Sequence, residues 1–498
     1  MLFNSITFAV FLPIVFLIYW VIGYARLNAA IKLVIQNGFI IVASYVFYGW
    51  WDWRFLLLIA FTSFCSWGSG LLIGQANTQS KAKAWMIANV ILNLGILAIF
   101  KYYDFFVSEF GRLFSVSTDN LLLRIILPVG ISFYTFQALS YSIDVYRGKM
   151  EPTKDIVAFF AFISFFPQLV AGPIERATNL LPQFQQNRTF NYAQAVDGMR
   201  QILWGLFKKM VIADNCATYV DQVWSTYSIQ NGSTLLLAAV LFTFQIYGDF
   251  SGYSDIAIGT AKLFGIQLMR NFNVPYFSRD IAEFWRRWHI SLTTWFRDYV
   301  YIPLGGSRPE IPAHIRNAER YREWIIVRNT FVIFLVSGFW HGANWTYIVW
   351  GAYHAILFLP LILLGKNRKY TNQVAETRIL PTWREAWQIL LTFTMVVIGW
   401  IIFRAETISQ ACDFMSDICT NGFFCKPYIQ ELRQAGPLAL GLLMMIALEW
   451  WNRAESHGLA INKTIPWQWV RRVVYLGLMM YILYFGKFDY NQFIYFQF

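Results

Sequence analysis

The sequence predicts an all-α, polytopic integral membrane protein, and three observations support this fold class. Of the 498 residues, 57% are hydrophobic and only 14% are charged, which is more apolar surface than a soluble domain of this length can bury. Apolar runs of nearly membrane-spanning length recur along the whole chain. Aromatic residues make up 19% of the chain, as expected where their rings anchor helices at membrane interfaces.

The apolar runs set the expected number of spans. Because a span needs roughly 20 apolar residues, we expect about eleven to thirteen transmembrane helices, some short or tilted, with re-entrant and interfacial helices beside them. The runs lie near residues 6–22, 33–50, 55–74, 84–100, 121–141, 156–171, 325–340, 345–364, 387–403, 436–450 and 472–486.

The polar stretches between the runs are only as long as loops or surface helices, which predicts one membrane domain over residues 1–498. We divide it into N-terminal helices (1–120), a catalytic core (121–365) and C-terminal helices (366–498). The two halves show no repeat, which weakens a transporter built from inverted repeats.

The net charge of +12 fits membrane topology better than a nucleic-acid partner, because Lys and Arg occupy short loops between apolar runs. Arg26 and Lys32 follow the first run, whereas the residues before it carry no charge. We therefore expect a multi-pass protein with its N-terminus outside the cytoplasm and an uncleaved first span.

The five cysteines lack the close Cys/His spacing of a metal site, so we expect no metal. Cys412, Cys419 and Cys425 share a loop-like stretch, where an extracytoplasmic disulfide stays an open alternative.

His341 is the first candidate for chemistry. It interrupts the apolar segment SGFWHGANW (337–345), with Ser337 and Trp340 before it and Asn344 after it. A histidine at membrane depth usually faces a cavity or a polar partner. Desolvation keeps such an imidazole neutral, and a neutral imidazole accepts a proton from an alcohol. A helix-packing histidine is the alternative, and His354 is expected to be structural.

The segment FWRRWHISLTTWFRDYVYIPLGG (284–306) holds the second candidate, His289. If the segment is helical, Trp285, Arg286 and His289 share one face with Thr293. An interfacial helix anchored by Trp and Arg is the competing interpretation.

Two further segments place polar residues among apolar ones. GDFSGYSDIAIG (248–259) contains Asp249, Tyr253 and Asp255, and its glycines at four-residue spacing favour close helix packing. We favour a supporting role for these carboxylates over direct catalysis. FQALSYSIDVYRG (136–148), with Gln137 and Tyr141, precedes a Pro- and Gly-rich stretch, and such broken backbone is typical of a tunnel lining.

Phosphate-loop, dinucleotide and metalloprotease signatures are missing from the sequence, which argues against ATP-driven transport by this chain alone.

The chain resembles the membrane-bound O-acyltransferase family, and within it the bacterial branch of alginate and peptidoglycan O-acetylation proteins. The resemblance covers nearly the full length. Beyond the segments quoted above it rests on PQLVAGPIER (167–176), NFNVPYFSRDIAEFWRRWHISLTTWFRDYVYIPLGGSR (271–308), SGFWHGANWTYIVWG (337–351), IIFRA (401–405) and FIYFQF (493–498).

The resemblance implies that His341 is the catalytic histidine and that His289 is a second polar residue facing a central tunnel. It implies acetyl-CoA as a cytoplasmic donor substrate, no permanently bound cofactor, and an acceptor hydroxyl on the other side of a bacterial inner membrane. A periplasmic SGNH-type acetyltransferase is the expected partner, with an alginate-like exopolysaccharide or peptidoglycan as final acceptor. A related branch transfers D-alanine from a carrier protein to teichoic acids.

We therefore expect His341 to act as general base while His289 orients the donor or stabilises the oxyanion. Trp340, Asn344, Ser337, Trp285, Arg286, Asp249, Tyr253, Asp255, Gln137 and Tyr141 are expected to line the substrate tunnel. Arg286 and Arg287 are candidates for the coenzyme A phosphates. A transporter of acyl groups or glycans without covalent chemistry, and a scaffold that only recruits an acetyltransferase, are the competing classes.

Overall fold

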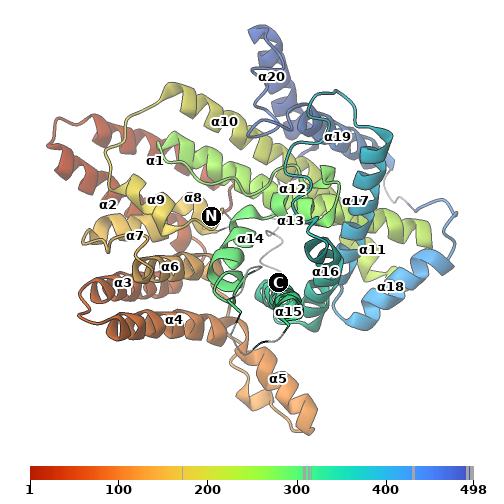
Figure 1. The fold of residues 1–498 in the computed structure, drawn as a ribbon. Helices are drawn as coiled ribbons and strands as arrows, with labels where there is room; N and C mark the ends of the chain where they lie inside the picture. The colour runs from red at the N-terminus through yellow and green to blue at the C-terminus, as the bar shows by residue number, and fades with distance from the viewer. Residues whose placement is uncertain are drawn as a thin grey trace. The chain divides into compact units, whose positions relative to one another are not determined.

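Helices are the only regular secondary structure in the described part of the chain, which confirms the predicted all-α fold class (Figure 1). The structure is a computed structural model. It describes residues 1–170, 172–306, 310–311, 315, 317–428, 432–488 and 493, with the backbone alone for 432–434. Three parts of the quoted motifs therefore lie outside the described residues, namely 171, 307–308 and 494–498.

Eight described helices are long and apolar enough to cross a membrane. They are α1 (Ile6–Tyr24), α2 (Ala29–Gly49), α3 (Arg54–Gly74), α4 (Gln79–Lys101), α12 (Gly232–Leu263), α15 (Ala318–His341), α16 (Trp345–Leu363) and α17 (Trp383–Arg404). The larger expected number of spans is not confirmed. The runs at 121–141 and 156–171 form only the shorter helices α6 (Ile131–Tyr146), α7 (Ile156–Ser164) and α8 (Phe166–Leu169).

The exposed residues of α1 show why such helices need a bilayer. Val10, Leu17 and Val21 follow one another at helical spacing, and each is more than half exposed. In water this apolar stripe would be costly, whereas lipid tails cover it without penalty.

By its internal contacts the chain divides into two units. The first comprises Met1–Ile202 and Tyr253–Met269. Its helix α6 packs against α3 and α4 and is buried along nearly its whole length. The unit also contains α5 (Tyr103–Phe114), α9 (Ala177–Phe184) and most of α10 (Tyr192–Leu206).

The second unit comprises Leu203–Gly252 and Arg270–Phe498. Here α12 packs against a π-helical segment, Phe207–Ala213, as the glycine spacing predicts. A Cβ on Gly248 would lie 3.0 Å from the Lys208 carbonyl oxygen, and one on Gly252 would lie 2.8 Å from that of Gly205. Only glycine allows this approach.

The other helices of the second unit include a tightly packed hairpin of α15 and α16, with α17 beside α16. The remaining ones are α11 (Asp214–Ser225), α13 (Ile281–Arg287), α14 (Ile290–Phe296), the π-helical segment Arg297–Tyr301, α18 (Ile408–Thr420), α19 (Leu432–Trp451) and α20 (Gln468–Phe485).

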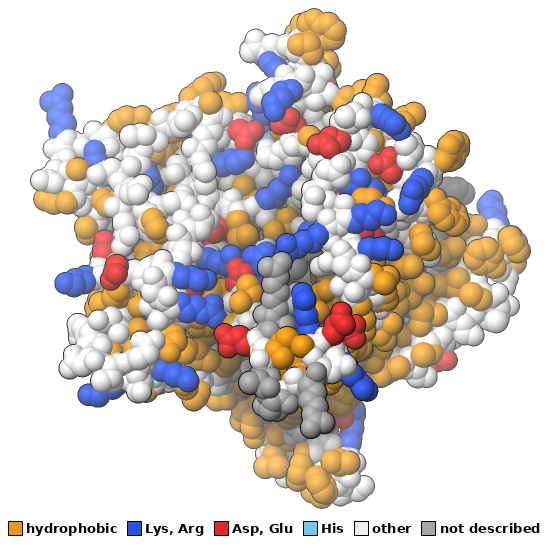
Figure 2. All heavy atoms as spheres, in the orientation of Figure 1, with side chains coloured by type: hydrophobic (Ala, Val, Ile, Leu, Met, Phe, Trp, Pro, Cys, Tyr) orange, Lys and Arg blue, Asp and Glu red, His pale blue; other side chains and the backbone are white. Residues whose placement is uncertain are grey.

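Hydrophobic side chains reach the surface over large areas, including the region of α5 in Figure 2. Phe106, Phe110 and Leu113 of this helix are each more than half exposed. This exposed apolar surface supports a multi-pass membrane protein.

Candidate active site

His341 is the last residue of α15, at the turn of the α15–α16 hairpin. Two glycines let the helices meet there. A Cβ on Gly338 would lie 2.2 Å from the Tyr347 carbonyl oxygen, and a Cβ on Gly342 would lie 2.2 Å from the Tyr347 ring. The glycines that flank His341 therefore serve the packing that fixes the position of its backbone.

Aromatic rings surround the His341 imidazole, which is 5% exposed. Its ring centroid lies 4.8 Å from that of Trp340, 5.3 Å from that of Trp350 and 5.3 Å from that of Phe403. The imidazole is thus packed among aromatic side chains of α15, α16 and the end of α17.

His289 lies between α13 and α14, in the left-handed backbone region with φ of 44°. The proposed continuous helical face of Trp285, Arg286, His289 and Thr293 is therefore wrong. Backbone hydrogen bonds hold the break in place. Ile290 N–H donates to Asn271 O at 2.8 Å, and Asn273 N–H donates to Arg287 O at 2.9 Å. A non-glycine residue adopts this strained conformation where its surroundings fix it, as at functional sites.

The hydrogen bonds of Asn271 define the tautomer of His289. Asn271 Oδ1 accepts from the backbone N–H of Ser291 at 3.3 Å and from its hydroxyl at 2.9 Å. The same oxygen lies 3.1 Å from His289 Nδ1. Since this oxygen can only accept, Nδ1 carries the proton and Nε2 carries the lone pair.

Burial lowers the pKa of His289 to about 3, because the charged imidazolium loses its hydration. This residue lies outside the eight candidate spans and is only 1% exposed. It is therefore a neutral hydrogen-bond acceptor at physiological pH.

Trp340 contacts both histidines. Its ring lies 4.8 Å from that of His341 and 6.1 Å from that of His289. Phe250 of α12 packs edge-on against His289 at 4.6 Å. The two predicted catalytic residues thus belong to one aromatic cluster in the second unit.

Trp285 and His354 extend this cluster. Their rings lie 5.0 Å apart, and each contacts Trp350, the neighbour of His341. His354 is fully buried. Among the described residues, no hydrogen-bond partner reaches either of its ring nitrogens. The structural role expected for His354 stays a prediction. Sequence reasoning missed Asn271, since only the fold brings it to the site.

Arg286 and Arg287 hold a loop. Arg286 donates to the carbonyl oxygens of Asn367 and Tyr370. Arg287 is buried and forms an ion pair with Glu283 at 2.8 Å. These guanidinium groups are thus already engaged, in contrast to the suggested role at coenzyme A phosphates.

Asp249 belongs to a buried ionic cluster in the second unit. Lys209 Nζ lies 2.8 Å from Asp249 and 2.9 Å from Asp214, and all three side chains are at most 5% exposed. Burial raises the pKa of Asp214 to about 7, and the nearby Lys209 opposes this shift. The cluster supports the packing of α12 against the π-helical segment, as favoured for Asp249.

The remaining predicted tunnel residues divide between the units. In the second, Ser337 is buried one turn before His341, and Asn344 caps α16 while donating to Glu406 O at 2.9 Å. The others lie in the first unit. Asp255 accepts from Gln201 at 2.7 Å, Tyr141 accepts from Thr153 N–H at 3.1 Å, Tyr253 contacts Phe3, and Gln137 is buried in α6. A tunnel shared by all of them stays a prediction.

Comparison with known proteins identifies the family. Residues 152–399 match the membrane-bound O-acyltransferase family. The chain is 40% identical over 417 residues to a probable alginate O-acetylase AlgI of Pseudomonas aeruginosa, covering 82% of this chain and 73% of that protein. It is 34% identical to a peptidoglycan O-acetyltransferase of Helicobacter pylori, covering 82% and 78%.

A teichoic acid D-alanyltransferase of Bacillus subtilis is more distant. It is 30% identical over 291 residues, covering 56% of this chain and 69% of that protein. The chain therefore belongs to the membrane-bound O-acyltransferase family, in the branch that includes the alginate and peptidoglycan O-acetylation proteins.

Proposed function

We propose that this acyltransferase moves an acetyl group from cytoplasmic acetyl-CoA across the membrane to a hydroxyl acceptor, for O-acetylation of an extracytoplasmic polysaccharide. The observation that carries the proposal is the pair of buried histidines that share Trp340 as a neighbour. The names of the relatives, an alginate O-acetylase and a peptidoglycan O-acetyltransferase, support the reaction and the kind of acceptor.

The distribution of basic residues supports the direction of transfer. Arg320 and Arg322 lie in the first turns of α15, and Lys366 and Arg368 follow α16. If both helices cross the membrane, the positive-inside rule places these ends in the cytoplasm and the His341 turn on the opposite side. The same rule applied to Arg26 places the N-terminus outside. A hydroxyl acceptor arriving from outside thus meets His341 first.

In the proposed mechanism His341 takes the proton of the acceptor hydroxyl while that oxygen attacks the thioester carbonyl carbon. The new C–O bond replaces the C–S bond, and the thiolate receives the proton to leave as free coenzyme A. His289 has its lone pair on Nε2, so it suits accepting a hydrogen bond from an amide N–H of the donor. This tautomer has no Nε2 proton for an oxyanion, so we assign His289 to orienting the donor.

The acceptor hydroxyl comes from a periplasmic SGNH-type partner or from the polysaccharide itself, and the enzyme resides in the bacterial inner membrane. D-alanyl transfer from a carrier protein is the second candidate, because teichoic acid D-alanyltransferases are also relatives. The higher identity and coverage of the O-acetylating relatives favour acetylation.

The test uses purified protein in proteoliposomes with acetyl-CoA outside and a soluble oligosaccharide inside. We expect release of free coenzyme A that depends on the acceptor, and acetyl groups on the enclosed oligosaccharide. A parallel reaction with D-alanyl carrier protein tests the second candidate. Acceptor movement without thioester consumption, or transfer from the carrier protein only, would contradict the proposal.

A further inference from the structure

The loop between α16 and α17 (residues 364–382) is fixed by four arginines from outside it. Arg279, Arg286 and Arg287 each donate to carbonyl oxygens of the loop, and Arg453 donates to three more. Ala375 within the loop has a left-handed backbone with φ of 47°. A loop held in this way loses little conformational freedom when a ligand binds.

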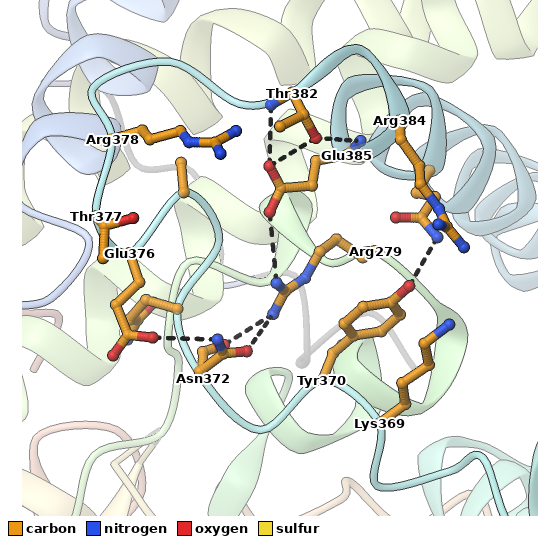
Figure 3. A pocket seen from close by; sticks show the side chains of 13 residues that line it. Arg279, Lys369, Tyr370, Asn372, Glu376, Thr377, Arg378, Thr382, Arg384 and Glu385 are labelled. Atoms are coloured by element: carbon orange, nitrogen blue, oxygen red, sulfur yellow. Dashed lines mark hydrogen bonds and ion pairs between the residues drawn. The ribbon is translucent and has the colours of Figure 1, made fainter.

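This loop, Arg279 and the first turns of α17 line an open cavity of about 560 Å³ (Figure 3). Four basic and two acidic side chains line it. Both carboxylates already have partners. Glu376 accepts from Asn372 at 3.1 Å, and Glu385 forms the capping box of α17 with Thr382 and lies 3.7 Å from Arg279.

Three cations of the cavity are left to receive a ligand. Lys369, Arg378 and Arg384 are exposed, and no carboxylate within the described part of the chain forms an ion pair with them. They come from both ends of the loop and from α17, so they surround the cavity (Figure 3). The N-terminus of α17 adds partial positive charge. Three cations around one concave space suit a ligand with several negative groups better than a single carboxylate.

We propose that this cavity binds the phosphate groups of an anionic ligand, and that Lys369, Arg378 and Arg384 contact them. Resting on the proposed function, we assign the ligand as the nucleotide end of the acetyl-CoA donor. Arginine and lysine recognise phosphate oxygens through short, charge-assisted hydrogen bonds. The basic loop is also the side that the positive-inside rule places in the cytoplasm.

The position of the cavity agrees with a donor that has a long arm. It lies at the N-terminal end of α17, whereas Phe403, the neighbour of His341, lies at the other end. A helix of 22 residues spans about 33 Å. The pantetheine arm of coenzyme A is shorter than this helix, but it needs to reach only the His289 segment. Asn372, which lines the cavity, accepts a hydrogen bond from Arg287, two residues before His289.

The test measures binding of coenzyme A, 3′-dephospho-coenzyme A and pantetheine to the full-length protein in nanodiscs. Arg378→Gln with Arg384→Gln removes two cavity cations, and Lys366→Gln with Arg368→Gln removes two cations of the same loop that do not line the cavity. We expect the first pair to weaken coenzyme A binding roughly ten- to a hundredfold, and the control pair to change it less than about threefold. Pantetheine, which lacks phosphate, should bind both variants like the wild type.

Native mass spectrometry in nanodiscs with phosphatidylglycerol distinguishes a lipid headgroup from the donor. Loss of retained lipid in the Arg378/Arg384 variant with unchanged coenzyme A binding overturns the donor assignment. Equal coenzyme A binding and equal lipid retention in the wild type and this variant overturn the phosphate site altogether. If the wild type nevertheless binds coenzyme A, acetyl-CoA remains the proposed donor and only the assignment of its phosphate site to this cavity is wrong. Absence of coenzyme A binding by the wild type would instead contradict the proposed donor.

Discussion

Asn271 offers a sharp test of how the site holds His289. Replacing Asn271 with Leu keeps a similar volume and removes the oxygen that accepts from His289 Nδ1 and from two groups of Ser291. Three buried donors then lose their acceptor. The Ser291 hydroxyl can rotate to another acceptor, which leaves two groups without a partner. At about 1–3 kcal/mol for each, we expect a stability loss of about 2–6 kcal/mol.

Asn271→Leu should also lower the activity of the protein that stays folded. Loss of the partner that orients a functional histidine typically costs ten- to a hundredfold, and we expect a loss of about that size in kcat/KM for Asn271→Leu. Asn271→Asp retains an acceptor and should keep most of the activity. Its carboxylate also favours the imidazolium, so the pKa of His289 should rise from about 3 and introduce an acid limb into the pH–rate profile.

The assay is acetyl transfer in proteoliposomes between about pH 5 and 9, with thermal unfolding in detergent as the folding control. In the wild type, His289 contributes no acid limb over this range. Full activity of Asn271→Leu, or a pH profile of Asn271→Asp identical to that of the wild type, would refute the assignment of Asn271 as a positioning residue.

Three further predictions concern stability. Gly338→Ala should cost about 1–3 kcal/mol through the Cβ clash at 2.2 Å and lower the Tm, whereas Gly68→Ala, with no neighbour within 4 Å, should not. Lys209→Met should cost about 3–5 kcal/mol, since it leaves the Asp249 and Asp214 carboxylates together without their cation; an unchanged Tm would contradict the buried cluster. The pKa of His289 is lowered from 6.5 to about 3, so the unfolded chain binds a proton that the folded one does not. Above pH 6.5 His289 is neutral in both states and does not change the free energy of unfolding. Below pH 6.5 protonation of the unfolded state lowers the free energy of unfolding by about 1.4 kcal/mol per pH unit, until the pH reaches about 3. Unfolding midpoints measured against pH should lose this slope in His289→Gln.

Local patterns predicted several features correctly. The spacing of Gly248 and Gly252 predicted close helix packing, and both glycines lie against backbone of the π-helical segment. Apolar runs predicted seven of the eight described helices that are long and apolar enough to cross a membrane, all except α12. This works because the length and composition of a segment decide whether it can span lipid. His341 could be singled out because it interrupts such a run between small residues.

Long-range contacts were beyond local patterns. The backbone beside His289 is held by hydrogen bonds to the distant residues Asn271 and Asn273. Neither the left-handed conformation of His289 nor the role of Asn271 therefore leaves a signal at helical spacing. His354 has ordinary helical neighbours in sequence, and only the fold places Trp285 against it.

The partners of charged residues also could not be predicted from local patterns. The sequence identifies Arg286 and Arg287 as basic residues near the site, but not which partners they choose. The fold uses both to hold the loop that carries Lys369 and Arg378.

The most direct test of the central claim is product acetylation by His341→Gln. Glutamine keeps size and polarity but has no basic nitrogen. Val336→Ala, on an exposed position of the same helix, is the matched control, and thermal unfolding verifies that each variant is folded. We predict that His341→Gln abolishes acetyl transfer from acetyl-CoA to the acceptor while Val336→Ala retains it. Transfer by folded His341→Gln at the wild-type rate would contradict the assignment of His341 as the base.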